Sequence, residues 1–358
     1  MKQQLSANMK QPQFVILGGG IIGLSCAVRL SEKYPDASLH IIGEHFSPHT
    51  TSDVAAGLWG PYALGNTPET TCRKWAKDTH TYMHQLWRSG HAEKCGLCLV
   101  PVVELFTAEE ETTPWWHNIV FGFQTHHLQP EHAELLGHKL GQNMYRTAIS
   151  YVTFTCEPTR IMSHYRKILS ARNAQFRTER LESLRCLTRL NINSNAIIIN
   201  CLGLGAQSVV GDTDLGPIRG QVQKVKAEGV FHSFANDECY IIPNTDTVTL
   251  GGTKQKSTRT RPCPVDRYMI RTNCTAIVPS LREARLLKDA VGLRPVRSTG
   301  VRVEMENVYL FDGEMDDASL LVHNYGHGGA GITLAWGCAG EVVHLVEREL
   351  GSTVESKL

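Results

Sequence analysis

Three glycines near the start of the chain have a spacing that allows a backbone to bind a pyrophosphate. Gly18, Gly20 and Gly23 follow the apolar run 14–17, which predicts a strand buried on both faces of a parallel sheet. Gly18 permits a tight turn, Gly20 has no Cβ to hold a phosphate away, and Gly23 lets the next helix pack closely on the strand. Because a helix N-terminus directs free N–H groups at phosphates, the stretch predicts a dinucleotide site. The alternative is an ordinary strand–helix turn.

The residues after the glycines complete this motif. A helix is expected over residues 24–31 and a second apolar strand over residues 39–42. Glu44 follows that strand, about 20 residues after the glycines, where a carboxylate accepts hydrogen bonds from the adenosine ribose hydroxyls. Ile21 and Ile22, at the start of the helix, are also predicted to contact the cofactor.

Composition limits the class of protein. The 358 residues suffice for about two domains, and 42% hydrophobic with 20% charged residues is ordinary for a globular protein. Lys and Arg number 36 against 35 Asp and Glu, so nucleic acid and acidic membranes are not expected partners. No apolar run reaches the roughly 18–20 residues that span a bilayer. The N-terminus lacks the apolar core of a secretory signal.

Eleven scattered cysteines do not suggest a disulfide framework, and no metal site is expected. The single motif Cys95-Gly96-Leu97-Cys98 has no second pair, so it predicts buried thiols. The last three residues, Ser356-Lys357-Leu358, match the address read by the peroxisomal import receptor. We therefore expect the peroxisome matrix. Peroxisomes house enzymes that make hydrogen peroxide, which favours a flavin over a nicotinamide cofactor.

The pattern of strands and helices predicts an α/β fold, a Rossmann-like FAD-binding domain with an inserted, mainly antiparallel β substrate domain. A helix over 158–171 and a strand over 196–200 repeat the β–α–β pattern, and alternating strands follow from 221. The predicted boundaries are 12–65, 151–215 and 286–350 for the FAD-binding domain, 66–150 and 216–285 for the substrate domain, and 351–358 for a targeting tail. Further elements are expected at 74–86, 96–103, 240–242, 247–250 and 332–350.

Six short blocks of the sequence share one family pattern. They are residues 50–59, 219–222, 240–243, 248–252, 291–295 and 323–329. In this order they resemble the D-amino-acid oxidases and the related D-aspartate oxidases. The resemblance implies a flavoprotein that oxidises D-amino acids to imino acids and passes the electrons to dioxygen, which yields hydrogen peroxide. The imino acid then hydrolyses to a 2-oxo acid and ammonia. Hydride transfer from Cα to flavin N5 needs positioning more than acid–base groups.

Arg294 fits that need, because its guanidinium fork can bind a substrate carboxylate bidentately. The resemblance implies that Tyr240 donates its hydroxyl to the same carboxylate, and it adds Gly329 to the catalytic residues. The alternative interpretation is that Arg294 lies on the solvated surface, as most arginines do. The block Gly292-Leu293-Arg294-Pro295, however, matches the family pattern.

Four further groups are expected to contact FAD. The backbone around the start of the last helix is predicted to stabilise the negative charge of the reduced flavin through its N–H groups. Hydroxyls near position 51 are expected to bind phosphates, and small residues after them to let the flavin ring approach. Leu181 and Leu202 are expected to line the flavin, but an ordinary position in the hydrophobic core explains each of them equally well. The residues are Gly328, Gly331, Ile332 and Thr333; Thr50, Thr51 and Ser52; Ala56, Gly57 and Leu58; and Leu181 and Leu202.

The substrate is predicted to be D-aspartate, and also D-glutamate. Lys254 stands where the resemblance implies a basic residue that pairs with the side-chain carboxylate, and the lid segment 227–239 is short. Two departures weaken this prediction: lysine replaces the expected arginine, and the lid offers His232 but no arginine. Residues 55–61 and 323–329 resemble the neutral-substrate branch instead, although Gly60 replaces the polar residue expected there. The alternatives are an oxidase of neutral D-amino acids, a nicotinamide-dependent dehydrogenase and a catalytically silent flavin-binding protein. The sequence leaves a homodimer open.

Overall fold

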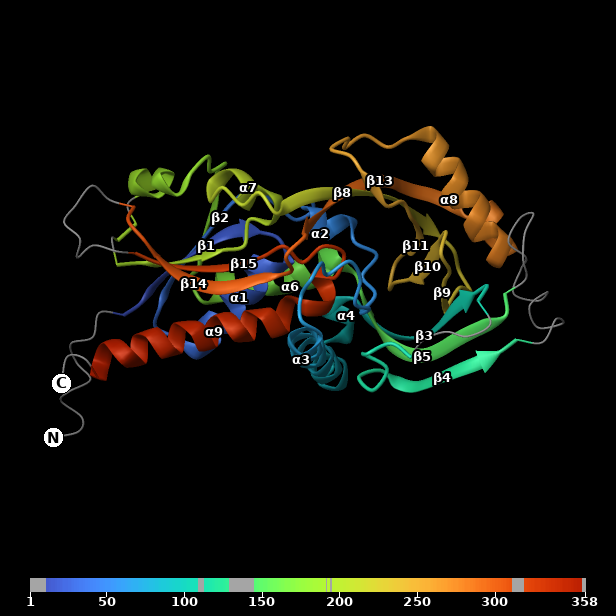
Figure 1. Ribbon diagram of the computed structural model, residues 1–358, viewed down its shortest axis with the longest axis horizontal. Coiled ribbons are helices and arrows are strands. Elements are labelled where there is room, and N and C mark those ends of the chain that lie inside the picture. The colour runs from blue at the N-terminus through green and yellow to red at the C-terminus, as the bar shows by residue number, and fades with distance from the viewer. Residues whose placement is uncertain are drawn as a thin grey trace.

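Two sheets, each at the centre of one half of the molecule, organise the fold (Figure 1). The computed structural model describes residues 11–108, 113–128, 145–190, 192–193, 195–310 and 319–355, with the backbone only for 352–355. In these residues the strand order is β14-β15-β7-β1-β2-β6 in the first sheet, and β12-β8-β11-β10-β9-β3-β5-β4 in the second, where β13 also pairs with β8.

The strands of the first sheet are β1 (Gln13–Gly19), β2 (Ser38–Phe46), β6 (Gln175–Thr178), β7 (Ile197–Asn200), β14 (Arg302–Val308) and β15 (Ser319–Tyr325). Those of the second are β3 (Leu97–Phe106), β4 (Phe121–His127), β5 (Thr147–Cys156), β8 (Leu215–Lys226), β9 (Ser233–Ala235), β10 (Tyr240–Pro243), β11 (Val248–Gly251), β12 (Gln255–Lys256) and β13 (Arg285–Arg297). The helices are α1 (Ile21–Lys33), α2 (Thr51–Val54), α3 (Glu69–Arg88), α4 (Ala92–Cys95), α6 (Pro158–Ala171), α7 (Ala206–Val209), α8 (Pro264–Ile277) and α9 (Gly331–Glu355). Short 3₁₀ helices cover Leu184–Leu190, Gly203–Gly205 and Pro279–Glu283.

The first sheet is parallel except for the antiparallel pair β14 and β15. The side chains of its central strand β1 point alternately into two hydrophobic cores. Phe14 and Ile16 pack into one hydrophobic cluster, and Val15 and Leu17 into another, and all four are fully buried. A strand can be apolar at every position only when both faces of its sheet are covered. The predicted strand buried on both faces is therefore confirmed.

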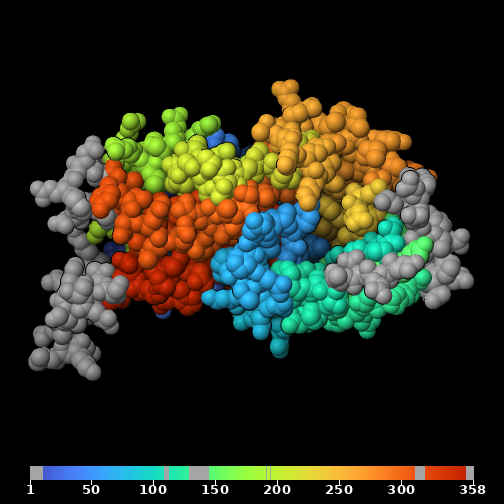
Figure 2. Space-filling view, viewed as in Figure 1, coloured from blue at the N-terminus to red at the C-terminus, as the bar shows by residue number. Residues whose placement is uncertain are grey.

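Helices α1 and α9 pack on one face of this sheet, and α6 packs on α1 and α3 on α9 in the same hydrophobic cluster (Figure 1). Helix α9, red in Figure 2, lies along the edge of the first half. Close packing of α3 and α9 depends on Gly337, because a Cβ there would collide with the backbone of Trp75. The Trp336 ring also stacks on Tyr82 with centroids 3.5 Å apart. Among the helices formed by the described residues, none is long and apolar enough to cross a membrane.

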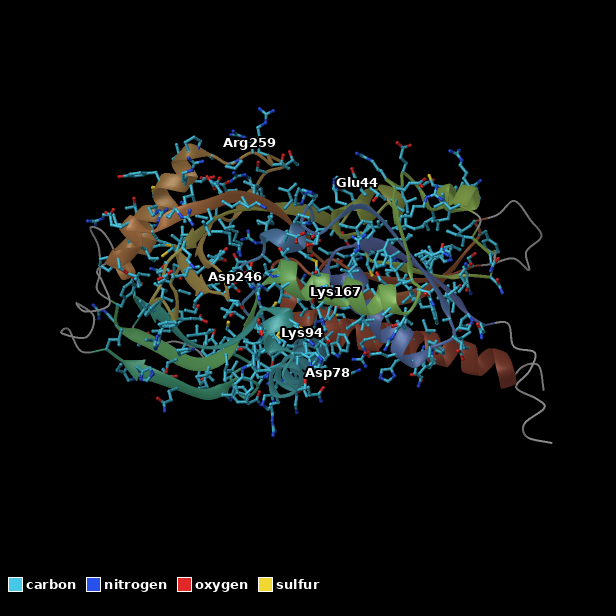
Figure 3. All side chains as sticks on the ribbon, turned by 180° about the vertical axis from the view of Figure 1, so that it is seen from behind. Glu44, Asp78, Lys94, Lys167, Asp246 and Arg259 are labelled. Carbon is cyan, nitrogen blue, oxygen red and sulfur yellow. The ribbon has the colours of Figure 1, made fainter. Side chains whose placement is uncertain are left out.

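The second sheet is mainly antiparallel, with one parallel pair between β3 and β9. Helix α8 packs on it through a separate hydrophobic cluster. Charged side chains show how the halves divide in Figure 3: Glu44 lies with the first sheet, and Asp246 and Arg259 with the second. This two-part α/β architecture agrees with the predicted fold class.

Most predicted elements lie within observed ones. The helix expected over 158–171 coincides with α6, while those expected over 74–86 and 332–350 are extended to α3 and α9. Strand β13 lies in the segment predicted for the FAD-binding domain but pairs with β8 along its length, and α3 lies in the segment predicted for the substrate domain but packs on α9. The predicted domain boundaries themselves remain a prediction.

Candidate active site

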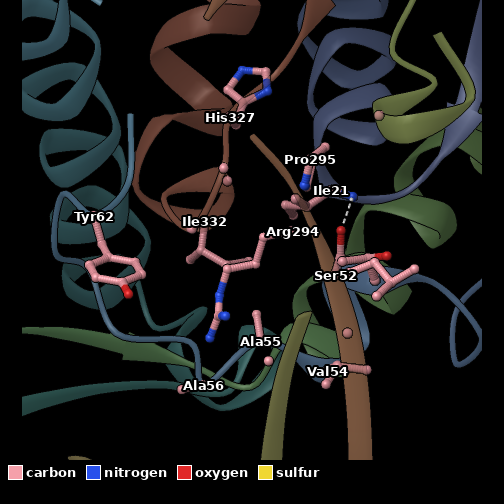
Figure 4. A pocket seen from close by; sticks show the side chains of 18 of the residues that line it. Ile21, Ser52, Val54, Ala55, Ala56, Tyr62, Arg294, Pro295, His327 and Ile332 are labelled. Carbon is pink, nitrogen blue, oxygen red and sulfur yellow. Dashed lines mark hydrogen bonds between the residues drawn. The ribbon is translucent and has the colours of Figure 1, made fainter. Parts of the chain in front are cut away.

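One large cavity of about 1040 Å³ lies between the two sheets and is lined by both. From the first half it takes the β1–α1 turn, the end of β2 and the segment before α9. From the second half it takes residues of β3, β5, β8, β10 and β13. Figure 4 shows Arg294 extending into it between Tyr62 and Ala55.

The β1–α1 turn has the geometry expected for a pyrophosphate. Gly18 adopts φ +117°, where a side chain would also collide with the Cys201 carbonyl. Gly20 caps α1 without a side-chain hydrogen bond, and a Cβ there would approach only Ser52 Oγ, at 3.0 Å. The Ile21 N–H donates to the same Oγ over 3.1 Å (Figure 4). Ser52 Oγ thus accepts one first-turn N–H of α1, and the other first-turn N–H groups have no partner within the helix and are available to an anion.

A buried carboxylate braces the loop that carries Ser52. Asp53 accepts hydrogen bonds from Ser47 Oγ at 2.6 Å, from the N–H and hydroxyl of Thr50 at 2.9 and 2.6 Å, and from Thr159 Oγ1 at 3.1 Å. The Thr50 hydroxyl is thus engaged with the protein, whereas Thr51 and Ser52 line the cavity beside the glycines. The brace fixes the loop that is predicted to hold phosphates.

Three consecutive carbonyls of the next loop point away from the cavity. Lys224 Nζ donates to the Ala55 carbonyl at 3.3 Å, Asn244 Nδ2 to that of Ala56 at 2.8 Å, and the Cys156 N–H to that of Gly57 at 2.9 Å. None of these three donors lines the cavity. In a planar trans peptide the N–H points opposite to the carbonyl. The N–H groups after these carbonyls therefore face the cavity, as a planar ligand with ring carbonyls would require.

The segment before α9 forms the opposite wall. Gly331 has open space around its absent Cβ, and the first-turn N–H groups of α9 have no partners within the helix. Two buried atoms in this segment, Asn324 Oδ1 and His327 Nε2, form no hydrogen bond with the described protein, and both residues line the cavity. Burial lowers the pKa of His327 to about 3, so its ring is neutral. A polar ligand would satisfy these atoms.

Arg294 and Tyr240, the predicted carboxylate clamp, lie together at the second sheet and both line the cavity. The guanidinium lies over Gly220, where any Cβ would collide with it, and its Nη1 donates to the Thr253 carbonyl at 2.9 Å. Burial raises the pKa of Tyr240, and the neighbouring Arg294 acts in the opposite direction. Among the residues that the structure describes, no carboxylate forms an ion pair with Arg294. Its positive charge therefore has no carboxylate partner within these residues.

Lys254 and Arg294 share an aromatic neighbour. The Lys254 Nζ lies 5.5 Å from the centre of the Tyr62 ring, and the Arg294 Cζ lies 5.9 Å from it, so both cations interact with one ring. Residues 50–70, blue in Figure 2, reach the surface between the two halves, and 45% of Tyr62 is exposed. Lys254 is also exposed, at the rim of the cavity.

The cavity brings together most of the predicted site residues. Those that line it are Gly18, Gly20, Ile21, Ile22, Glu44, Thr50, Thr51, Ser52, Ala56, Gly57, Leu58, Leu181, Leu202, Tyr240, Lys254, Arg294, Gly328, Gly329, Gly331 and Ile332. Two lie behind its wall. Gly23 packs against the Gly18 carbonyl, which is the helix-packing role predicted for it, and the Thr333 hydroxyl binds the backbone of Gly60.

Sequence reasoning missed several cavity residues, including Tyr62, Glu104, Trp116 and Tyr151. Tyr62 follows a family block by three positions, so its neighbourhood was a usable signal. The other three lie on β3, on β5 or before β4, far from any motif. Only the pairing of strands brings them to the cavity.

The fold and the cavity define an FAD-dependent oxidoreductase. The family model described as "DAO: FAD dependent oxidoreductase" matches residues 13–345, and the chain belongs to that family. It is 35% identical to human D-aspartate oxidase over 342 residues, which cover 94% of this chain and 95% of that protein. It is 33% identical to a D-amino acid oxidase of Dugesia ryukyuensis over 337 residues, covering 92% and 96%.

Glycine oxidase from Bacillus cereus ATCC 14579 has the same fold. Its solved structure has a TM-score of 0.73 at 19% sequence identity, covering 95% of this chain and 96% of that one. The chain is thus an FAD-dependent oxidoreductase of the D-amino-acid oxidase family. The residues present fit FAD: the β1–α1 turn for the pyrophosphate, and the inward N–H groups after Ala55 together with the unpaired His327 Nε2 for a polar ring.

Proposed function

We propose that the protein oxidises D-aspartate, and also D-glutamate, to the 2-oxo acid, ammonia and hydrogen peroxide. The observation that carries the proposal is the pair of cations on the Tyr62 ring. Arg294 serves the α-carboxylate, and Lys254 is a second cation at the same cavity. The 35% identity to human D-aspartate oxidase supports the same substrate.

Hydride transfer requires little acid–base catalysis by side chains of the protein. FAD, when bound, supplies the acceptor for the hydride of the substrate Cα. Arg294 and Tyr240 bind the α-carboxylate, and Gly220 leaves room for the guanidinium to lie flat beside the sheet. Because the carboxylate is fixed at one end, Cα is held in the orientation that hydride transfer needs. This orientation lowers the entropic part of the activation barrier. The loop after Ala55 and the start of α9 direct N–H dipoles at the ring.

Lys254 would select for a second carboxylate at the other end of the substrate. Its ammonium is a point charge on a flexible stem, so its grip is weaker than a bidentate arginine. Because the side chain is exposed, solvent screens the attraction, and a surface pair of this kind contributes about 1 kcal/mol or less. That exposure favours a second candidate, an oxidase acting on neutral D-amino acids.

Rates of peroxide formation from D-aspartate, D-glutamate and D-alanine test the proposal. We expect kcat/KM to be highest for D-aspartate. A higher value for D-alanine would favour the neutral-substrate candidate, and the absence of peroxide from every D-amino acid would contradict both.

We further propose that the protein acts in the peroxisome matrix, where its import receptor would bind Ser356-Lys357-Leu358. These three residues lie outside the described part of the chain. Deleting them from a fluorescent fusion should leave the protein in the cytosol, and unchanged peroxisomal fluorescence would contradict the proposal.

A further inference from the structure

We propose that Lys224 is a positioning residue that acts on FAD through the backbone of the loop at residues 55–57 and raises the reduction potential of the bound cofactor. The nearby carboxylate of Glu157 acts in the opposite direction and limits the effect. The inference rests on the FAD-dependent family and on the shape of the loop, and it does not depend on the preference for D-aspartate. Neither Lys224 nor Glu157 lines the cavity.

Strand β8 places Lys224 directly behind this loop. Gly220 and Val222 of β8 line the cavity, and alternate residues of a strand point to the same face of its sheet. Lys224 is therefore on the cavity face, two residues further along, yet it is only 7% exposed. Its Nζ reaches the back of the loop, where it donates to the Ala55 carbonyl over 3.3 Å.

Packing alone does not explain a lysine at this buried position. Burial lowers the pKa of Lys224, because the charged form loses its water, and the Glu157 carboxylate acts in the opposite direction. Glu157 Oε1 lies 4.0 Å from Nζ, which is too far for a hydrogen bond. Among the residues that the structure describes, the Ala55 carbonyl is the one hydrogen-bond acceptor for this amine. An ammonium buried with so few partners is unfavourable for stability, which indicates another role.

The peptide between Ala55 and Ala56 carries the effect of Lys224 toward the cavity. Because a trans peptide is planar, the Ala56 N–H points opposite to the Ala55 carbonyl and faces the cavity. A cation that donates to the carbonyl polarises the peptide and makes this N–H a stronger donor. Uptake of two electrons and one proton leaves a negative charge on the ring of FAD, and a fixed positive charge or an aligned N–H stabilises it. We therefore expect Lys224 to favour the reduced cofactor.

Glu157 provides the opposing charge. It precedes α6, its side chain is 13% exposed, and its Oε2 accepts a hydrogen bond from Thr247 Oγ1 at 3.4 Å. The negative charge of Glu157 partly cancels the field of Lys224 at the cavity. Loss of this charge should therefore shift the potential in the opposite direction from loss of Lys224. A merely structural role would instead give shifts of the same sign, because both substitutions disturb the support of the same loop.

Anaerobic titration of the FAD-loaded protein against a reference dye, without any amino acid, measures the potential. We expect Lys224→Met to lower the equilibrium constant for two-electron reduction about tenfold, which makes the potential about 30 mV more negative. Lys224→Arg keeps a cation and N–H donors, so its constant should stay within about threefold of wild type. Glu157→Gln should raise the constant. Lys226→Met is the matched control, because it removes an exposed cation two residues along β8, and it should leave the potential unchanged.

Each outcome decides for or against the role of Lys224. An unchanged potential in Lys224→Met that still binds FAD overturns the proposal, and so does a shift in Lys224→Arg as large as that in Lys224→Met. If Lys224→Met does not retain FAD, Glu157→Gln decides: a less negative potential supports the proposal, and an unchanged or more negative one contradicts it. Because no D-amino acid takes part in the measurement, these results leave the proposed function untouched. Failure to oxidise D-aspartate would likewise leave the role of Lys224 intact.

Discussion

The two halves of the cavity are built in different ways. The cofactor half uses backbone: glycines in the β1–α1 turn, carbonyls tied back behind residues 55–57, and the start of α9. The other half is lined by side chains that come from separate strands, among them Arg294 and Tyr240, and we call it the substrate half after their predicted role. Backbone recognition serves one cofactor that every turnover needs, whereas side chains can change singly. We therefore expect the cofactor half to set the chemistry and the substrate half to set the choice of substrate.

Among the substitutions in the substrate half, Arg294→Leu should cause the largest decrease in kcat/KM. In Arg294→Leu, the substrate carboxylate loses a charged partner, and breaking a buried pair of this kind costs about 3–5 kcal/mol, a hundredfold to several-thousandfold in kcat/KM. FAD should still bind, which its visible spectrum checks. Loss of FAD together with activity would contradict the division into halves.

Arg219 provides the contrast on the neighbouring strand. It is 2% exposed, and its guanidinium donates to Gln221, Gln255 and Asp266 side chains and to two backbone carbonyls. Because every donor group already has a protein partner, Arg219→Leu should lower the thermal midpoint of unfolding, which scanning calorimetry measures.

Gly20→Val should weaken FAD binding without changing the substrate half of the cavity. Gly20 has φ −85°, which any residue adopts, and a Cβ would approach only Ser52 Oγ, so Gly20→Val is expected to fold. The added side chain would hold the pyrophosphate away from α1 and remove charge-assisted hydrogen bonds, raising the Kd for FAD about a hundredfold. Fluorescence titration of apoprotein with FAD measures it. An unchanged Kd would show that the pyrophosphate does not lie on this turn.

Lys254→Met should produce a smaller, substrate-dependent change. The ratio of kcat/KM for D-aspartate to that for D-alanine is expected to fall about fivefold, the value of an exposed ion pair. Lys256→Met, two residues along on β12 and outside the cavity lining, is the matched control. A change of the same size in both variants would assign the effect to net charge rather than to contact.

A pH dependence of stability, separate from activity, is also expected. Burial lowers the pKa of His80 to about 4 and that of His327 to about 3, against an ordinary value near 6.5. Below pH 6.5 the unfolded chain binds more protons than the folded one, so stability is present above 6.5 and is lost as the pH falls. Thermal midpoints should decrease from pH 7 to pH 5. A constant or rising midpoint would contradict the neutral, buried state of these rings.

Sequence alone predicted the cofactor half well, because its signals are local. Gly18, Gly20 and Gly23 and their flanking strand and helix lie within about 20 residues, and the structure confirms that arrangement. Glu104 and Tyr151 could not be found this way, because 47 residues separate them and only the pairing of β3 with β5 brings them together. Long-range pairing leaves no local pattern in the sequence. On the substrate side the sequence therefore predicted Arg294, Tyr240 and Lys254, which lie in or next to the family blocks, but not Glu104 and Tyr151.

Anaerobic reduction of the bound flavin tests the central claim most directly, because it needs both halves in one step. We expect D-aspartate to bleach the visible flavin absorbance of the purified, yellow holoenzyme, L-aspartate to leave it unchanged, and Arg294→Leu to bleach at least a hundredfold more slowly at subsaturating substrate. Absence of bleaching with any D-amino acid, or equal rates in wild type and Arg294→Leu, would contradict the account.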